Sequence, residues 1–259
     1  MMQPGYRIIL IALLVVGQQV AAEPPPDTIT QFSTIDALLS GVYDGQFGFS
    51  QLLQYGNWGI GTFDRLDGEM MILEGRIFQI RSDGKAYHPP TEDTTPFASV
   101  VQFKPDKRFR VESPLSLEEL QQRIDQEAPD LNSFCAVRID GTFSQIKTRS
   151  VPPQDKPYPP LVEVTKNQPE FLFENVEGIL FGFRCPSYVK GINVTGYHLH
   201  FLSRDEKQGG HLLSATLKEG WVDLDNCHRF NMILPAGDED FMNADLKKDR
   251  TEELEKVEK

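Results

Sequence analysis

Three of the five histidines are spaced in a way that suits a metal site. His198 and His200 are two residues apart in an alternating segment, so on a β-strand their side chains project from the same face. A polar stretch that ends in Gly209-Gly210 precedes His211 and is typical of a hairpin loop. An antiparallel return strand would bring His211 beside the first pair, so we predict that three imidazoles converge on one cation.

This set of nitrogen ligands indicates zinc. Three histidines leave coordination positions open, which is typical of catalytic rather than structural Zn²⁺ sites. The motif contains no carboxylate or thiolate ligand, which favours Zn²⁺ over copper or iron. Isolated histidines are more often surface or hydrogen-bonded residues, and we interpret His88 and His228 in this way.

Length, charge and composition narrow the class of protein. The 259 residues allow one large or two small domains, and 18 prolines with 20 glycines favour strands and turns over a helical bundle. The net charge of -12 repels phosphate backbones, so nucleic-acid binding is not expected. Cys135, Cys185 and Cys227 form no CxxC motif. Two of them could pair in an exported protein, but we interpret all three as small buried side chains.

The first 22 residues have the pattern of an export signal. Arg7 precedes an apolar run over residues 8–16, and Val20-Ala21-Ala22 supplies small residues for cleavage. The apolar run is shorter than the ~20 residues that span a bilayer. We therefore expect cleavage after Ala22, export to the periplasm or the medium, and no membrane attachment of the mature chain. Residues 23–29, which include three consecutive prolines, are expected to be a disordered lead-in.

Local patterns predict the elements that position the histidines. Ser116-Leu117-Glu118-Glu119 is a capping box, which starts a helix that runs to about Glu127. Asp83-Gly84 and Asp140-Gly141 are hairpin signals between strand-like segments. Residues 150–160 hold five prolines and cannot form regular structure.

These patterns predict an α+β fold class. The expected divisions are a mixed α/β N-terminal domain over residues 30–160, a mainly antiparallel β C-terminal domain with the zinc site over residues 161–240, and a charged tail over residues 241–259.

Three blocks of the sequence resemble the α-acetolactate decarboxylase family. The family's metal signature is similar to Gly196-Tyr197-His198-Leu199-His200-Phe201 followed by Gly209-Gly210-His211. The other two blocks are Gly59-Ile60-Gly61-Thr62-Phe63 with Leu66-Asp67-Gly68-Glu69, and Thr148-Arg149-Ser150-Val151-Pro152 with Pro157-Tyr158-Pro159. The blocks occur in the family's order, and the resemblance covers the mature chain from about Thr30 to the end.

The resemblance implies a two-domain α/β fold that forms a homodimer, with one Zn²⁺ per subunit bound by the three histidines. It also implies that Glu69 is an acid/base carboxylate, that Arg149 binds the substrate, and that Thr62 lies at the substrate site. In this family a second glutamate reaches the active site from the C-terminal tail. Counting back from the family's tail favours Glu258 over the other three glutamates of residues 241–259.

The implied reaction is the decarboxylation of 2-acetolactate, a 2-hydroxy-3-oxo acid, to acetoin and CO2. Loss of CO2 leaves an electron pair that the neighbouring ketone accepts as an enediolate, and Zn²⁺ stabilises the developing oxygen charge. Glu69 would protonate the carbon, while Arg149 positions the carboxylate. Two alternatives are a secreted zinc hydrolase with a three-histidine metal-bound water, and a secreted metal-binding or carbohydrate-binding module without turnover.

Overall fold

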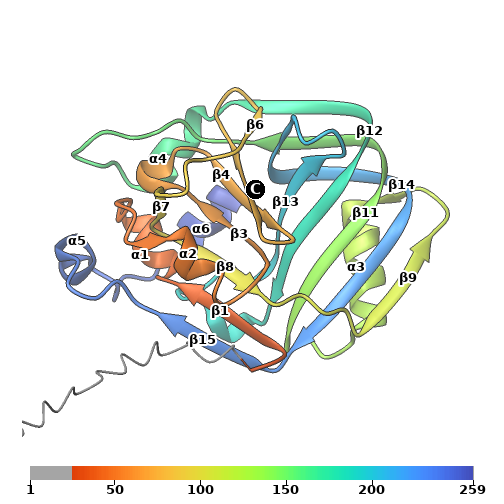
Figure 1. Cartoon of the computed structure of the whole chain (residues 1–259), viewed down its shortest axis with the longest axis horizontal. Helices are drawn as coiled ribbons and strands as arrows, with labels where there is room; N and C mark the ends of the chain where they lie inside the picture. The colour runs from red at the N-terminus through yellow and green to blue at the C-terminus, as the bar shows by residue number, and fades with distance from the viewer. Residues whose placement is uncertain (1–24, 259) are drawn as a thin grey trace, which may run out of the picture.

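Two β-sheets packed against each other dominate the structure (Figure 1). The computed structural model describes residues 25–258, so the predicted export signal over residues 1–22 lies outside the described residues. A few short helices accompany the sheets, in agreement with the predicted sheet-rich α+β class.

The first sheet has seven strands in the order β15-β1-β8-β3-β4-β5-β6. β1 and β15 pair in parallel, and the other neighbours pair antiparallel. The bounds are β1 (Thr28–Phe32), β3 (Trp58–Thr62), β4 (Glu69–Leu73), β5 (Arg76–Ile80), β6 (Ala86–Tyr87), β8 (Ala98–Val101) and β15 (Arg229–Ile233).

The second sheet has six strands, and four of them are joined in a closed ring of strand pairings. Its order is β10-β14-β11-β12-β13, β9 pairs with β14, and an additional pairing joins β13 to β14. The bounds are β9 (Lys107–Val111), β10 (Leu115–Ser116), β11 (Phe134–Arg149), β12 (Glu170–Cys185), β13 (Gly196–Ser203) and β14 (Gly209–Cys227). The start of β14 is therefore paired with both β13 and β11, which brings three strands together at one end of the sheet.

Short helices and a small ribbon complete the fold. β2 (Phe47–Gly48) and β7 (Thr94–Thr95) form a two-stranded sheet. The helices are α1 (Ile35–Ser40), α2 (Phe49–Leu52), α3 (Leu117–Glu127), α4 (Leu161–Val164), α5 (Glu239–Asn243) and α6 (Thr251–Glu258). Among residues 25–258, no helix has the length and apolarity needed to cross a membrane.

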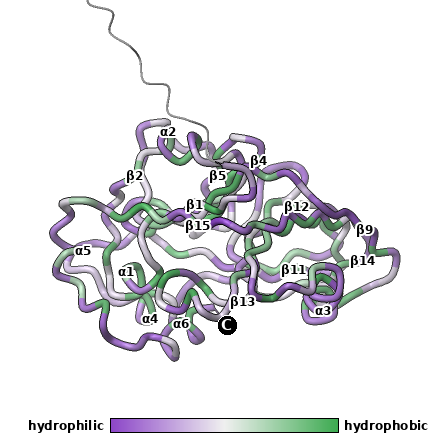
Figure 2. The backbone as a smooth tube through the Cα atoms, turned by 90° about the horizontal axis from the view of Figure 1, so that it is seen from below, coloured by the Kyte–Doolittle hydropathy of each residue, from purple (hydrophilic) through white to green (hydrophobic). Residues whose placement is uncertain are grey.

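Apolar burial joins the two sheets. Trp58 of β3 packs on Phe181 of β12 with ring centroids 5.0 Å apart, and both belong to one buried cluster with residues of both sheets. Burial of an aromatic side chain of this size contributes about 1.5–3 kcal/mol. At the outer side of the second sheet β9 is mostly hydrophilic, and both views place it at the opposite end of the molecule from α5 (Figures 1 and 2).

Some local predictions are confirmed. Ser116 caps α3, because its Oγ accepts from the Glu119 N–H while the Glu119 carboxylate accepts from the Ser116 N–H. The turn at Asp83-Gly84 is present, with Gly84 at φ +75° and its N–H donating to Arg81 O at 2.8 Å. Cys135, Cys185 and Cys227 are all free and buried, as interpreted from the sequence.

The hairpin predicted at Asp140-Gly141 is wrong. β11 runs without interruption from Phe134 to Arg149, and Gly141 pairs with Gly178 on one side and Gly220 on the other. A Cβ at Gly141 would lie 2.5 Å from Glu219 O. The glycine therefore permits close approach of neighbouring strands instead of a turn.

The sheets divide the chain differently from the predicted boundaries. β9, β10 and β11 precede residue 160 but pair with β14, while β15 returns to the first sheet beside β1. The expected lead-in over residues 23–29 also differs, since β1 starts at Thr28 and is buried along its whole length. In both cases long-range strand pairing decides the arrangement, and the local composition does not reveal it.

We predict that Gly182→Ala destabilises the sheet that carries the histidines. Gly182 of β12 pairs with Leu199, and an added Cβ would lie 2.0 Å from His198 O. The strands must separate, which typically costs about 1–3 kcal/mol. Urea unfolding would measure the loss.

Gly48→Ala is the matched control, because Gly48 has φ -75° and an added Cβ would meet nothing within 4 Å. Equal unfolding free energies for the two variants would contradict the proposed close approach of β12 and β13.

Candidate metal centre and active site

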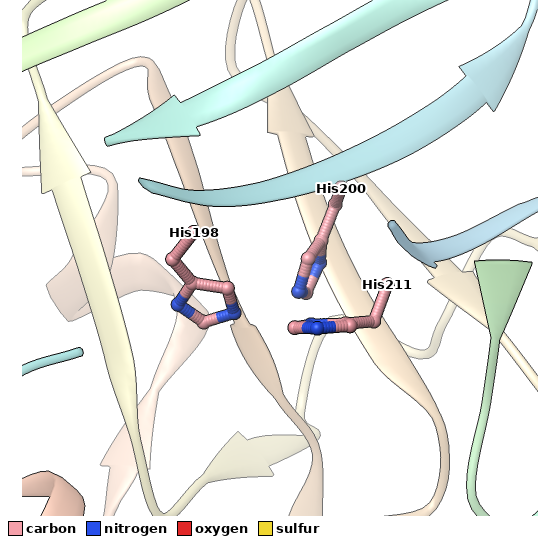
Figure 3. A group of neighbouring side chains, drawn as sticks. All are labelled: His198, His200 and His211. Atoms are coloured by element: carbon pink, nitrogen blue, oxygen red, sulfur yellow. The ribbon is translucent and has the colours of Figure 1, made fainter. Parts of the chain in front are cut away.

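Three imidazoles converge from two paired strands (Figure 3). His198 and His200 lie on β13 and His211 lies on β14, with one potential ligand atom from each residue within 4.8 Å of the others. The ring centroids are 5.0 to 5.4 Å apart. The convergence expected from the sequence is therefore present.

Strand register explains this placement. His200 pairs with His211 across β13 and β14, and His211 pairs with Arg149 across β14 and β11. Directly paired residues on neighbouring strands present their side chains to the same face. The two glycines before His211 make the close pairing possible, since a Cβ at Gly210 would lie 2.5 Å from Arg149 O.

The imidazoles are buried and neutral, which is the form that ligates metals. Burial lowers the pKa of His198 to about 3 and the pKa values of His200 and His211 well below the ordinary value, with Arg149 adding to each effect. The His200 Nδ1–H donates to Met70 O at 2.8 Å, because a carbonyl can only accept. The Nε2 lone pair of His200 is then left buried without a hydrogen-bond partner.

This unpaired nitrogen shows that the residues fit a metal cation. A buried polar atom without a partner costs about 1–3 kcal/mol, which a coordinated ion would offset. The hydrogen bond from Nδ1 to a backbone carbonyl is also the usual way in which a ligating histidine is oriented.

Two carboxyl groups lie close to different histidines of this group. Glu69 Oε2, at the start of β4, lies 3.6 Å from His200 Nε2, and Glu258 Oε2, at the end of α6, lies 3.6 Å from His211 Nε2. Burial raises the pKa of each carboxyl to about 7, although Arg149 acts in the opposite direction. Near neutral pH each group can therefore hold or release a proton.

Arg149 lies between the two carboxyl groups. Its Nη1 is 3.7 Å from Glu69 Oε1 and its Nη2 is 3.9 Å from Glu258 Oε1. Nη2 donates to Val257 O at 2.9 Å and Nη1 donates to Gln168 Oε1 at 3.1 Å. The Nε–H is buried without a partner, so the guanidinium retains a free donor for an anionic group.

Thr62 supports Glu69 from the neighbouring strand. The two residues pair across β3 and β4, and the Thr62 hydroxyl donates to Gly68 O at 2.7 Å. This bond fixes the turn directly before Glu69. The structure thus places Thr62 beside the site, with its hydroxyl proton engaged by the backbone.

Apolar contacts of α6 bring the tail glutamate into the site. Leu254 and Val257 are buried in a cluster with residues of α1 and α4, and the adjacent Glu258 points to His211. Glu252 and Glu255 are exposed, and Glu253 pairs with Lys248 at 2.5 Å. Of the four tail glutamates, Glu258 is thus the one that the structure places beside His211 and Arg149.

Comparisons with known proteins identify the family. A family model described as α-acetolactate decarboxylase matches residues 29–248. This chain belongs to the α-acetolactate decarboxylase family. It is 51% identical over 233 residues to the α-acetolactate decarboxylase of Methanosarcina mazei, which covers 90% of this chain and 81% of that protein. The Bacillus subtilis α-acetolactate decarboxylase is 42% identical over 224 residues, covering 86% of this chain and 88% of that protein.

A solved structure of this family has the same fold. The crystal structure of α-acetolactate decarboxylase from Bacillus subtilis strain 168 superposes with a TM-score of 0.87 at 40% identity, covering 89% of this chain and 99% of that chain. The predicted family and the predicted enzyme class, a decarboxylase among carbon–carbon lyases, are confirmed. The family favours this class over the hydrolase and the non-enzymatic module.

Sequence reasoning missed two groups that hold Arg149. Gln168 lies between a short 3-10 helix and Pro169, outside the blocks that carry the family resemblance, and no local pattern marks it. The second group is the backbone carbonyl of Val257, which no residue type could indicate. Both contacts join segments far apart in the sequence.

We predict that His211→Ala abolishes metal binding. The variant removes one of three ligands and leaves a gap between His200 and Arg149, so the bound metal should fall from one ion per chain to near zero. Elemental analysis of the purified protein would measure this content.

His228→Ala is the control, because the His228 side chain is exposed and its ring nitrogen Nδ1 contacts the hydroxyl of Ser133. Full metal occupancy in His211→Ala would rule out a site built on three imidazoles.

We also predict a pH-dependent contribution of Glu69 to stability. Its pKa rises from 4.5 to about 7 on folding, so the folded chain holds this proton more tightly than the unfolded chain. The contribution is fully present below about pH 4.5 and is lost as the pH rises through about 7. In chelator-treated protein, the wild type should therefore lose stability relative to Glu69→Gln as the pH rises from about 5 to 8.

Urea unfolding at several pH values would measure this difference. A gap that stays constant with pH would contradict the raised pKa of Glu69.

Proposed function

We propose that this chain decarboxylates 2-acetolactate to acetoin and CO2, with Zn²⁺ bound by His198, His200 and His211. The observation that carries the proposal is the placement of Arg149 beside the carboxyl groups of buried Glu69 and partly buried Glu258, next to three neutral imidazoles. This arrangement offers a place for a carboxylate, a proton donor and a metal within one buried site, in a chain of the decarboxylase family.

The histidines suit Zn²⁺ because all three ligands are nitrogen atoms and coordination positions remain open. When bound, Zn²⁺ would supply Lewis-acid stabilisation of negative charge that develops on substrate oxygen atoms.

Arg149 binds and orients the carboxylate of the substrate. The Arg149 side chain is only 5% exposed, so solvent screens its interaction with an anion only weakly. The unpaired Nε–H provides a donor that no protein group occupies. Because the carboxylate leaves as neutral CO2, orientation is the useful contribution, and a very tight ion pair would oppose the reaction.

Glu69 delivers the proton that completes the reaction. Loss of CO2 leaves an electron pair on C2 that the neighbouring ketone accepts, and a proton must then reach that carbon. The carboxyl of Glu69, with a pKa of about 7, can hold this proton near neutral pH, and the residue is 7% exposed to solvent. Its position on a sheet strand fixes the direction from which the proton arrives, and Glu258 lies near the other terminal nitrogen of Arg149.

Thr62 assists by keeping Glu69 in place, as its bond to Gly68 O is one residue away. We propose that its hydroxyl oxygen also accepts a hydrogen bond from the substrate, because the hydroxyl keeps acceptor capacity after donating its proton.

We also propose that the protein is exported and forms a homodimer. The basic, apolar and small-residue pattern of residues 1–22 supports cleavage after Ala22 and function in the periplasm or the medium. The family resemblance supports a homodimer. We further propose that no membrane anchor remains after cleavage.

We expect Glu69→Gln to keep the metal and lose activity by at least about a hundredfold, because the amide cannot donate the required proton. Acetoin formation from 2-acetolactate, measured beside the zinc content, tests this.

Glu74→Gln, an exposed position one residue beyond the end of β4, is the control and should behave as the wild type. Normal acetoin formation by Glu69→Gln would remove Glu69 from the mechanism, and absence of acetoin with the zinc-loaded wild type would refute the proposed reaction.

A further inference from the structure

Gln168 lies beside Arg149 because two segments of the chain are fixed together. The backbone N–H of Ser150 donates to Pro169 O at 3.3 Å, and Arg149 pairs with Glu170 across β11 and β12. The residue directly before Pro169 is thereby held next to the guanidinium. Its own N–H donates to Thr165 O at 3.4 Å, which anchors it to the short 3-10 helix before it.

Both acceptors of Arg149 are electrically neutral. Across residues 25–258, its two hydrogen bonds go to Gln168 Oε1 at 3.1 Å and to Val257 O at 2.9 Å. The carboxylate oxygens of Glu69 and Glu258 lie at 3.7 and 3.9 Å, beyond hydrogen-bond distance. The protein therefore orients the guanidinium with an amide and a carbonyl.

The choice of an amide has a chemical consequence. A carboxylate in direct contact with arginine forms a strong charge-assisted pair and would compete with the carboxylate of a substrate. An amide oxygen fixes one N–H of Arg149 but adds no charge. The guanidinium keeps its full charge and its unpaired Nε–H, while its rotation is restricted.

We propose that Gln168 is a positioning residue, which holds Arg149 in the orientation that binds the substrate carboxylate without neutralising it. This inference rests on the proposed function, because it assigns to Arg149 the carboxylate of the 2-hydroxy-3-oxo acid. Gln168 acts through Arg149 and needs no contact with the reacting atoms.

Two variants of Gln168 separate positioning from a structural role. Gln168→Ala removes the acceptor, so KM for 2-acetolactate should rise by about tenfold and stability should fall. Gln168→Glu keeps the acceptor and its shape but adds a charge, so KM should rise by roughly a hundredfold while stability stays close to that of the wild type. Gln168→Glu should thus be more stable than Gln168→Ala but bind the substrate more weakly.

The matched controls are Gln154→Ala and Gln154→Glu. Like Gln168, Gln154 lies in the segment between β11 and β12, and its side chain bonds only to Pro152 O among the described residues. Both control variants should keep the wild-type KM.

Binding of 2-hydroxyisobutyrate provides a readout that does not depend on turnover, since this hydroxy acid has a carboxylate but no ketone. Titration calorimetry on the zinc-loaded protein should give weaker binding in the order wild type, Gln168→Ala, Gln168→Glu.

The outcomes distinguish the two proposals. Wild-type KM and wild-type 2-hydroxyisobutyrate affinity in Gln168→Glu would overturn the positioning role, even if acetoin is formed normally. A wild type that forms no acetoin, but whose variants bind 2-hydroxyisobutyrate in the expected order, would refute the proposed reaction and support the role of Gln168 in carboxylate binding. Affinity losses that simply follow the stability losses would also overturn the positioning role.

Discussion

The site depends on the double pairing of one short stretch of β14. His211 pairs with His200 on one side and with Arg149 on the other, so two potential ligands and the guanidinium stand in one row. A register shift of one residue on any of these strands would turn its side chain to the opposite face. Gly209 permits this register, since a Cβ there would lie 2.2 Å from Phe201 O.

The row of His200, His211 and Arg149 lies among several ionisable groups, whose charges must balance within one largely buried space. Two carboxyl groups with pKa values raised by burial, and three imidazoles with lowered pKa values, share a space with one buried guanidinium. Buried charges are tolerated when they are paired or coordinate metals. Arg149 and a divalent cation would offset the charge of either carboxyl group when it is ionised, and α6 supplies one of these groups, Glu258.

Sequence reasoning reached the parts of the site that have local signals. The alternation of His198 and His200 indicates one strand face, and the glycine pair before His211 indicates a return strand. Glu69 and Arg149 have no such local signal and were found through family blocks. Gln168 was missed because its contact with Arg149 depends on how β11 and β12 pair, and the Asp140-Gly141 turn was wrong because glycine serves close strand approach as well as turns. The predicted boundary at residue 160 did not anticipate that β9 and β11 would join the strands that follow it.

Anomalous diffraction at the zinc edge from crystals of the zinc-loaded protein tests the central claim most directly. The expected result is a single peak within about 2.0–2.1 Å of one nitrogen from each of His198, His200 and His211, including Nε2 of His200. A peak bound by fewer than three of these imidazoles, or strong zinc density elsewhere with none between them, would contradict a catalytic metal centre built on this strand row.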